Sequence, residues 1–394
     1  MNPARESGER VPISTEAGPV DAFLPAPLPP EPPLEIDTAT QSLQAEAMLE
    51  LGRLDGLTSR LPDPDQFLFA FARKEAVLSS QIEGTQSSLS DLMLFERGAV
   101  PEVPAGDVQE AVNYVLALNH GLDLIRNGIP ISLRVIREMH EVLLRGTRGG
   151  STGAGDYRKV PNWIGGADPL SARYVPPPPD LVPDAMDSLE AFLHGEPEAF
   201  PILLRAGLAH AQFEAIHPFL DGNGRVGRLL VTMMLTSETA DGLRPVLGHP
   251  LLYLSLYLKK NRTEYYNRLL AVTEQGDWEG WMSFFLKGVI SVARSTIDTT
   301  RGILALLDDD RRRIASLGRS GGSALQVFEM FSREVVLRIP EIVTTLEMTE
   351  PTASKAVRTL EDEGIVAEVT GQKRNRIFVY REFLEILNEE TENP

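Results

Sequence analysis

The sequence predicts a mainly helical protein with one β-hairpin flap and a small module of helices and strands at its C-terminal end. Three observations support this fold class. Residues 202–216 carry apolar side chains at helical spacing, and residues 225–235 resume a mostly apolar helical run. Residues 156–178 contain two short extended runs around a Gly-Gly turn. Residues 323–394 combine helical stretches with two strand-like runs, so the helical body and this module form separate domains.

The N-terminal part divides into a proline-rich stretch and a helical region. Residues 1–36 contain nine prolines and predict a Pro-rich tail or an extended wrap over the body. Residues 37–106 predict helices. One helical stripe in this region carries four apolar side chains, Phe67, Phe71, Leu78 and Ile82. Gly84 predicts a helix end, so Glu83 should project from the end of that helix.

A central domain follows over residues 107–290, and a connecting helix and linker over residues 291–322 join it to the C-terminal module. Within the central domain, residues 217–228 form a loop between the two predicted helices. Gly222, Asn223 and Gly224 readily take positive φ angles and come just before a helix. Successive backbone N–H groups there can converge on an anion, and phosphate is the natural ligand.

The charged residues of this loop point to the same chemistry. Arg225 and Arg228 lie at a helix N-terminus, where a cation is unfavourable unless a polyanion is also bound. Asp221 offers an oxygen ligand for Mg²⁺ beside the phosphates. His217, with a reference pKa of roughly 6.5, suits a general base. Each residue alone fits a cap, a turn or a solvated face, but their combination favours a nucleotide site, with Phe219 anchoring the loop in the core.

The run His217–Arg228 resembles the Fic-domain signature His-x-Phe-x-Asp-Gly-Asn-Gly-Arg-x-x-Arg at every defined position. Such proteins transfer AMP from ATP to a protein hydroxyl. The resemblance implies that His217 deprotonates the target and that Asp221 holds Mg²⁺ on the α- and β-phosphates. The nucleotide-binding residues that it implies are Glu83, Glu214, His217, Gly222, Asn223, Gly224, Arg225, Val226, Gly227, Arg228 and Asn261. Related death-on-curing toxins, which phosphorylate, replace the Gly-Asn-Gly segment, so the intact segment favours adenylyl transfer.

A second resemblance lies at Ser79-Ser80-Gln81-Ile82-Glu83-Gly84, which is similar to the Ser/Thr-x-x-x-Glu-Gly inhibitory motif of Fic proteins. It implies that Ser79 and Glu83 belong to an inhibitory segment and that Glu83 pairs with Arg228. A charge-assisted pair of this kind competes with the triphosphate for the same cation. Two alternatives stay open: Glu83 as a solvated terminal residue, and Glu83 as a participant in AMP removal.

Residues 156–178 resemble the Fic flap, which lies over the active site and pairs with the target segment by strand addition. The target protein would therefore bind along this flap. Trp163 and Tyr174 are expected to be packing aromatics rather than target contacts. The resemblance also places Asn261 beside the adenine and Glu214 along the site.

Residues 323–394 are similar to a winged helix-turn-helix domain, with a basic loop at 370–376 as the wing. Residues 351–381 hold six basic and four acidic side chains, a net charge of +2, which is weak for DNA binding. Winged helices also make protein or dimer contacts. DNA binding through residues 351–381 and protein contact, including a homodimer, therefore both stay open.

Composition narrows the function classes. At 394 residues with 42% hydrophobic content, the chain is long enough for two or three domains, and its net charge of −18 disfavours nonspecific binding to nucleic acid or anionic membranes. The absence of cysteine excludes disulfides and thiolate chemistry. His140 and His210 are expected to be ordinary core or surface residues. The chain shows neither a signal region nor an apolar run near 18 residues, so a cytoplasmic location without membrane partners is expected.

The sequence thus predicts a protein adenylyltransferase with ATP and Mg²⁺, autoinhibited by Glu83, that modifies a Ser, Thr or Tyr hydroxyl and releases pyrophosphate. Modification of the chain itself stays open. One alternative is a DNA-binding regulator whose Fic core senses a nucleotide without turnover. Another is a Fic enzyme that transfers a different group.

Overall fold

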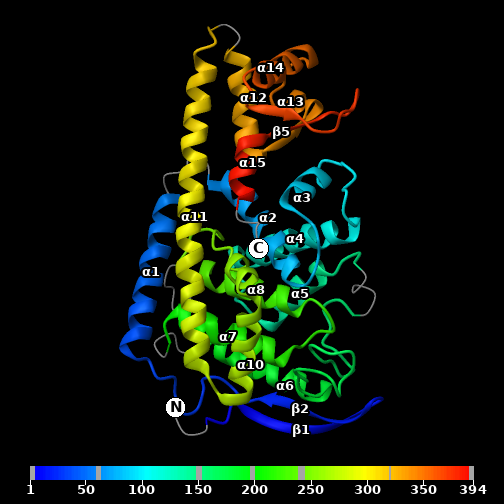
Figure 1. Cartoon of the computed structure of the whole chain (residues 1–394), viewed down its shortest axis with the longest axis vertical. Helices are drawn as coiled ribbons and strands as arrows, with labels where there is room; N and C mark the ends of the chain where they lie inside the picture. Colours follow the sequence, from blue (N-terminus) through cyan, green and yellow to red (C-terminus); the bar gives the residue numbers. More distant parts are fainter. Residues whose placement is uncertain are drawn as a thin grey trace. The chain divides into compact units, whose positions relative to one another are not determined.

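The chain forms two compact units in the computed structural model (Figure 1). The structure describes residues 5–58, 64–147, 153–195, 200–237, 245–318 and 321–389, with the backbone alone at 64–68. Unit 1 comprises Met1–Asp55 and Asn113–Ala293, and unit 2 comprises Gly56–Val112 and Arg294–Pro394. This division differs from the predicted order of domains, because much of the predicted N-terminal helical region groups with the C-terminal module.

Unit 1 is built around a pair of buried helices. α7 and α8 pack against each other, α6 and α10 pack on α7, and α5 packs on α8. Almost every side chain of α7 and α8 is buried, as the two apolar runs predict. The described elements here are β1 (Gly8–Thr15), β2 (Gly18–Pro25), α1 (Thr38–Thr58), α4 (Ala105–Arg126), α5 (Leu133–Leu143), η2 (Pro179–Leu181), α6 (Val182–Leu193), α7 (Ile202–Ile216), α8 (Asn223–Thr236), α9 (Ser255–Lys260), α10 (Arg262–Gln275) and α11 (Trp278–Ala315); α1, α4 and α11 extend into unit 2.

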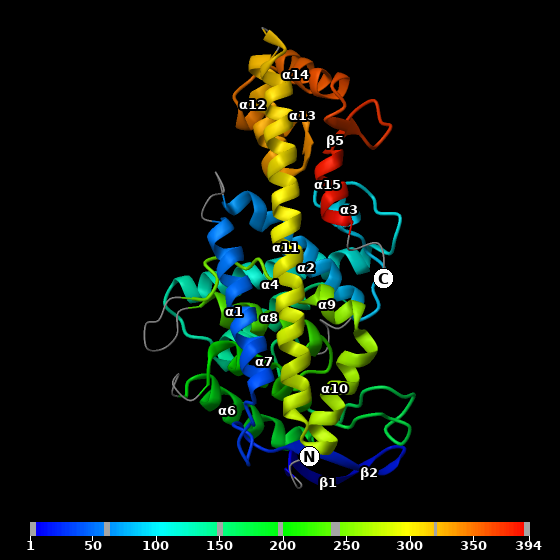
Figure 2. The ribbon, with the colours of Figure 1, turned by 60° about the vertical axis from the view of Figure 1, so that its left-hand side comes forward.

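The N-terminal stretch is only in part the tail or extended wrap that its nine prolines predict. Residues 8–25 form the antiparallel hairpin β1–β2, and Figures 1 and 2 draw it beside one end of α10. Pro12 lies in an outer strand, where its missing N–H costs no ladder bond, while Pro19 and Pro25 lie near the two ends of β2. The backbone N–H of Phe23 donates to the carbonyl of Val175 at 2.8 Å, which ties the hairpin to the flap.

The flap over residues 156–178 turns where the sequence predicts. Ile164 and Tyr174 form one antiparallel bridge, and Gly165 and Gly166 between them have φ angles of 66° and 134°. A side chain at Gly166 would approach the carbonyl of Ser171 to 2.6 Å, so only glycine fits. The packing role expected for Tyr174 is confirmed, because its hydroxyl donates to the carbonyl of Ala215 at 2.7 Å. Trp163, which lies before the turn, is 37% exposed, so its side chain is only partly packed.

Unit 2 combines two N-terminal helices with the C-terminal module. Its sheet has the antiparallel order β3–β5–β4, and α12 packs against α14 and against α2. The three helices and two strands that the sequence predicts for the module are all present, and β3 and α15 are additional. The described elements are α2 (Pro64–Ile82), α3 (Leu89–Phe95), α12 (Gly321–Glu334), β3 (Val336–Arg338), α13 (Ile339–Thr345), α14 (Glu350–Asp362), β4 (Val366–Glu368), β5 (Ile377–Tyr380) and α15 (Arg381–Asn388).

Two predicted boundaries in this region are wrong. The connecting helix begins at Trp278 rather than near residue 291, because α11 is one continuous helix. Gly321 and Gly322, expected in a linker, lie in the first turn of α12. Of the predicted apolar stripe on α2, Phe71, Leu78 and Ile82 are buried, while the side chain of Phe67 lies outside the described part. Within the described ranges, no helix combines enough length and apolar character to span a bilayer.

Candidate active site

The candidate site begins where α7 ends in unit 1. His217 has φ and ψ angles of 48° and 60°, a left-handed conformation that few residues other than glycine adopt. Its backbone N–H donates to the carbonyl of Phe213 at 2.9 Å, which closes the last turn of the helix. The chain therefore turns sharply at the predicted base and carries it out of the helix into the loop.

Arg158 supports this turn from the start of the flap, and the sequence analysis missed it. Its side chain is buried and donates to the carbonyls of His217, Ile216 and Pro177, and its backbone N–H donates to the carbonyl of Pro218. Burial lowers the pKa of Arg158 to about 10. This guanidinium satisfies several backbone acceptors at once and holds the strained turn. No periodic pattern marks it, because its partners lie far along the chain.

The side chain of Asn223 has a role that the sequence does not predict. Its buried side chain accepts from the N–H of Phe219 and donates to the carbonyl of Phe219, both at 2.8 Å. Gly222 has a φ angle of 81°, whereas Asn223 and Gly224 already lie in the first turn of α8. The prediction of three consecutive residues suited to positive φ is therefore wrong at two of them. The side chain of Asn223 holds the loop, because its amide group both donates to and accepts from the backbone of Phe219.

His140 packs against the signature loop. Its ring stacks on Phe219 with centroids 3.7 Å apart. Nδ1 accepts the backbone N–H of Gly155 at 2.9 Å, so Nε2 carries the proton that is shared with the carbonyl of Asp221 at 3.0 Å. Burial lowers the pKa of His140 to about 4, which keeps the ring neutral. The expectations that His140 is a satisfied core residue and that Phe219 anchors the loop are both confirmed.

The start of α8 offers the predicted anion site. The first intrahelical bond runs from the N–H of Val226 to the carbonyl of Gly222 at 3.0 Å. The amides of residues 223–225 therefore come before the regular bonding pattern of the helix, at the positive end of its dipole. Arg225 and Arg228 are both buried beside them. Two buried guanidiniums and a helix N-terminus concentrate positive potential at one point, which favours a polyanion.

Asp221 is placed to meet a cation at the edge of this site. Its carboxylate is 55% exposed, and Oδ1 accepts from the N–H of Gly222 at 2.6 Å and from Arg225 at 3.2 Å. In the described part of the chain, no three His, Asp or Glu side chains gather as a metal cluster. A single carboxylate fits Mg²⁺, which keeps several waters and shares the phosphates of its substrate. The predicted role of Asp221 as a metal ligand stays a prediction.

Glu214 lies next to the predicted base. Its Oε2 is 4.0 Å from Nδ1 of His217, and both side chains are largely buried. A side chain at Gly227 would approach Oε1 of Glu214 to 2.6 Å, so any larger residue there would require the Glu214 side chain to shift. The structure therefore brings together Glu214, His217 and the second half of the signature, as the sequence predicts.

The remaining predicted residues are Asn261, Ser79 and Glu83. Asn261 ends α9, and its amide donates to the carbonyl of Tyr257 at 2.9 Å, so its observed role is to cap that helix. Ser79 is buried in α2, and Glu83 is exposed in the turn that follows this helix, just before Gly84 with a φ angle of 104°. Both belong to unit 2, so their relation to the loop of unit 1 remains an expectation.

Comparison with protein families agrees with this geometry. Residues 130–235 match the model of the Fic/DOC family, and residues 41–123 match the model of the Fic/DOC family N-terminal region. The matched region 130–235 includes the loop described above, so this part of the chain is similar to the Fic domain.

Solved structures share the fold. The chain is similar to a Fic family protein from Desulfovibrio desulfuricans, with a TM-score of 0.57 and 20% identity over 88% of this chain and 97% of that one. It is also similar to a Fic domain containing signaling protein from Bacteroides thetaiotaomicron, with a TM-score of 0.50 and 19% identity over 67% of this chain and 97% of that one. At these identities the likeness concerns the fold alone.

Curated relatives include named adenylyltransferases. A probable protein adenylyltransferase of Aquifex aeolicus is 28% identical over 179 residues, which cover 44% of this chain and 51% of that protein. The protein adenylyltransferase Fic of Drosophila grimshawi is 28% identical over 221 residues, which cover 54% of this chain and 41% of that protein. The chain thus spans about half the length of the curated relatives it matches, or less.

Proposed function

We propose that this protein transfers AMP from ATP to a Ser, Thr or Tyr hydroxyl of a target protein and releases pyrophosphate. The observation that carries the proposal is the complete signature loop, in which a left-handed His217 leaves α7 next to the N-terminus of α8 and two buried arginines. The relatives named protein adenylyltransferases support the same reaction and imply ATP as the substrate.

In the proposed reaction, His217 takes the proton of the target hydroxyl through one of its ring nitrogens. The hydroxyl oxygen attacks Pα, a new P–O bond forms, and the bond from Pα to the bridging oxygen of the pyrophosphate breaks. General base catalysis of this kind contributes about 10²–10⁴-fold in rate. The first amides of α8 together with Arg225 and Arg228 bind the phosphates and stabilise the charge that develops on them. Glu214, 4.0 Å from His217, orients the ring.

Asp221 is the residue that would hold Mg²⁺, which neutralises charge on the phosphates when it is bound. The exposed carboxylate beside the start of α8 suits this role. Asn261 is proposed to contact the nucleotide next to the helix end that it caps. The target is proposed to pair with the flap, whose backbone would supply affinity with little demand on the target sequence.

Glu83 is proposed to restrain the enzyme by pairing with Arg228 and excluding the γ-phosphate. Ser79 would belong to the same inhibitory segment. The C-terminal module has the helix and strand order of a winged helix-turn-helix, and its exposed basic side chains Lys355, Arg358, Lys373 and Arg374 offer a contact surface. Whether DNA, another protein or a second copy of the chain binds there is a separate question from catalysis.

Labelled ATP tests the proposal directly. Wild-type protein, His217→Ala and Glu83→Gly are incubated with ATP labelled at the α-phosphate, with and without Mg²⁺, and covalent label on protein is measured. Adenylylation under autoinhibition is supported if Glu83→Gly carries more label than wild type. The double variant Glu83→Gly/His217→Ala should then carry none. No label in either wild type or Glu83→Gly would instead favour a nucleotide sensor.

A second measurement separates the transferred groups. ATP and other nucleotides are compared for their ability to raise the melting temperature of His217→Ala, which binds without turnover. Protection by ATP but not by other nucleoside triphosphates supports AMP transfer. Equal protection by another nucleotide would favour transfer of a different group.

A further inference from the structure

The inhibitory segment and the C-terminal module lie in the same compact unit, although more than two hundred residues separate them in sequence. α2, which ends just before Glu83, packs against α12 of the module. Val327, Phe328 and Phe331 of α12 are buried, and α2 is buried from residue 70 onwards on nearly all its sides. A helix packed in this way moves with its neighbour rather than independently, because interiors are close-packed.

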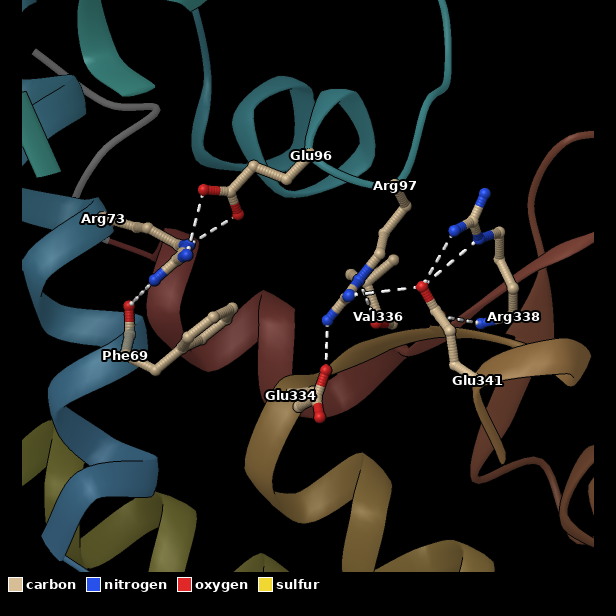
Figure 3. Close-up of polar contacts among 8 residues, drawn as sticks. All are labelled: Phe69, Arg73, Glu96, Arg97, Glu334, Val336, Arg338 and Glu341. Atoms are coloured by element: carbon tan, nitrogen blue, oxygen red, sulfur yellow. Dashed lines mark hydrogen bonds and ion pairs between the residues drawn. The ribbon is translucent and has the colours of Figure 1, made fainter. Parts of the chain in front are cut away.

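Arg97 joins the two segments through polar contacts (Figure 3). Its guanidinium forms ion pairs with Glu334 at the end of α12 and with Glu341 in α13, the latter at 3.3 Å. Its Nε also donates to the carbonyl of Val336 in β3 at 3.0 Å. Arg97 is 19% exposed, so this network is partly shielded from water and stronger than a surface ion pair.

The three acceptors of Arg97 surround a strained point of the module. Val335, between Glu334 and Val336, has a φ angle of 60°, a conformation that a β-branched residue rarely adopts. Such strain persists only where the surroundings determine the backbone. Arg97 therefore bonds the residues on both sides of Val335, where the chain passes from α12 into β3.

A further contact ties Arg97 back to the inhibitory helix. Glu96, its neighbour, accepts two bonds from Arg73 of α2 at 2.7 Å and 2.9 Å, and Arg73 lies over the ring of Phe69 (Figure 3). Asn388 of α15 adds a bond to Ser90 of α3 at 3.2 Å. The contacts form one chain of bonds from the module through residues 96 and 97 to α2.

The turn that carries Glu83 is bonded to the same helix. The N–H groups of Glu83 and Thr85 donate to the carbonyl of Ser80, and the amide of Gln81 donates to the carbonyl of Ser87 at 2.8 Å. A displacement of α2 would therefore carry the turn with it. The position of the Glu83 carboxylate depends on where the module holds this helix.

We propose that the C-terminal module positions the inhibitory segment, with Arg97 as the positioning residue that connects them. The inference rests on the proposed function, in which Glu83 restrains adenylylation. A ligand or partner that displaces the module would relieve the restraint without any contact to the nucleotide site. In this account the extra domain is a regulatory part of the enzyme.

The test compares full-length variants. Arg97→Glu reverses the charge that joins the segments, and Arg97→Glu/Glu334→Arg restores an opposite pair. Arg338→Ala is the matched control, because its side chain also bonds Glu341 at 3.0 Å but stays within the module. Each is made in the wild-type and Glu83→Gly backgrounds. AMP incorporation and hydrogen exchange of the amides at 79–84 are measured for all of them, and Arg97→Gln replaces Arg97→Glu if the latter does not fold.

The expected result is that Arg97→Glu raises incorporation about fivefold or more in the wild-type background and adds nothing in Glu83→Gly. The charge swap should return the rate toward wild type, and Arg338→Ala should stay within about twofold. Hydrogen exchange of the amides at 79–84 should rise in Arg97→Glu, return toward the wild-type rate in the charge swap, and stay near it in Arg338→Ala. A merely structural loss would not depend on the residue at position 83.

Two results would overturn the inference while the proposed function stands. In one, Glu83→Gly raises incorporation but Arg97→Glu behaves like Arg338→Ala. In the other, Arg97→Glu has the same effect whether or not Glu83 is present. If no variant incorporates AMP, the proposed function fails, and hydrogen exchange alone then tests whether the module positions residues 79–84. Unchanged exchange of these amides in Arg97→Glu rejects the positioning role of Arg97. Raised exchange supports that role.

Discussion

The signature loop of unit 1 and the proposed inhibitory segment of unit 2, residues 79–84, are held in different ways. The loop combines local and distant supports: Asn223 bonds Phe219 four residues away and Asp221 bonds Gly222 and Arg225, while Arg158 and His140 support it from other segments. In our proposal this segment takes its position through Arg97, whose partners in α12, β3 and α13 lie 237 to 244 residues away. The comparison teaches that bonds between near neighbours hold much of the loop, whereas the proposed positioning of the segment comes only from distant parts of the chain.

The largest expected effect concerns the two bonds between the Asn223 side chain and the backbone of Phe219. Asn223→Ala removes both bonds to the backbone of Phe219 and leaves a buried N–H and a buried carbonyl without them, each at a cost of about 1–3 kcal/mol. AMP incorporation in the Glu83→Gly background should fall by about 100-fold. Urea unfolding should show a loss of a few kcal/mol. Asn127→Ala, which removes an exposed bond in α4, is the control; similar losses in both variants would contradict a local lock.

A smaller effect is expected at the close approach of α8 to Glu214. Gly227→Ala places a methyl group 2.6 Å from Oε1 of Glu214 and 3.2 Å from the ring of Phe213, an overpacking that costs about 1–3 kcal/mol. Activity should fall about tenfold, because Glu214 and His217 must shift. Gly52→Ala is the matched control, since nothing lies within 4 Å of an added methyl group there, and helix propensity should make it mildly stabilising. Full activity of Gly227→Ala would exclude Glu214 from the site.

Acid should affect unit 1 through its histidines. All six histidines of the chain lie in unit 1, and burial lowers the pKa values of His140 and His210 to about 4. Between about pH 6.5 and 4, the unfolded chain protonates these two histidines and the folded unit does not. The free energy of unfolding of unit 1 is therefore highest above about pH 6.5 and decreases as the pH falls toward 4. Each buried histidine contributes a slope of at most about 1.4 kcal/mol per pH unit.

Hydrogen exchange at several pH values checks this difference between the units. The opening free energy of amides in α8 should fall between pH 6.5 and 4.5 by more than that of amides in α14. His210→Phe, which removes one of the two groups together with its bond to Tyr265, should reduce the slope in α8. Equal slopes in both units would show that histidine burial does not control the acid response.

The smallest expected effect lies in the module. Tyr380 donates its hydroxyl to Asp310 at 2.6 Å in a buried pair that joins β5 to α11. Tyr380→Phe should cost about 1–2 kcal/mol by denaturant unfolding, because Asp310 keeps its ion pair with Arg313 at 2.6 Å. Activity in the Glu83→Gly background should not change, since restraint is already absent. A large loss of activity there would mean that the module serves catalysis as well as regulation.

Much of the candidate site could be predicted from the sequence because its information is local. Apolar spacing predicted α7 and α8, and the order of residues 217–228 predicted which side chains gather at the start of α8. What the sequence left out are the supports that arrive from other segments. Arg158 and His140 hold the backbone of His217 and Asp221 from 59 and 81 residues away, and a lone arginine or histidine carries no periodic signal.

The sequence by itself determined the helices around the site and the chemistry of the signature loop, because helical spacing and loop conformation depend on residues within a few positions of one another. Only the tertiary structure decided that a proline-rich start folds as the hairpin β1–β2, and that α2 groups with the C-terminal module. Both outcomes depend on which distant surfaces fit together, through a bond such as that from Phe23 to Val175 or ion pairs such as those of Arg97. Packing of that kind depends on shape and partner, which no local pattern records.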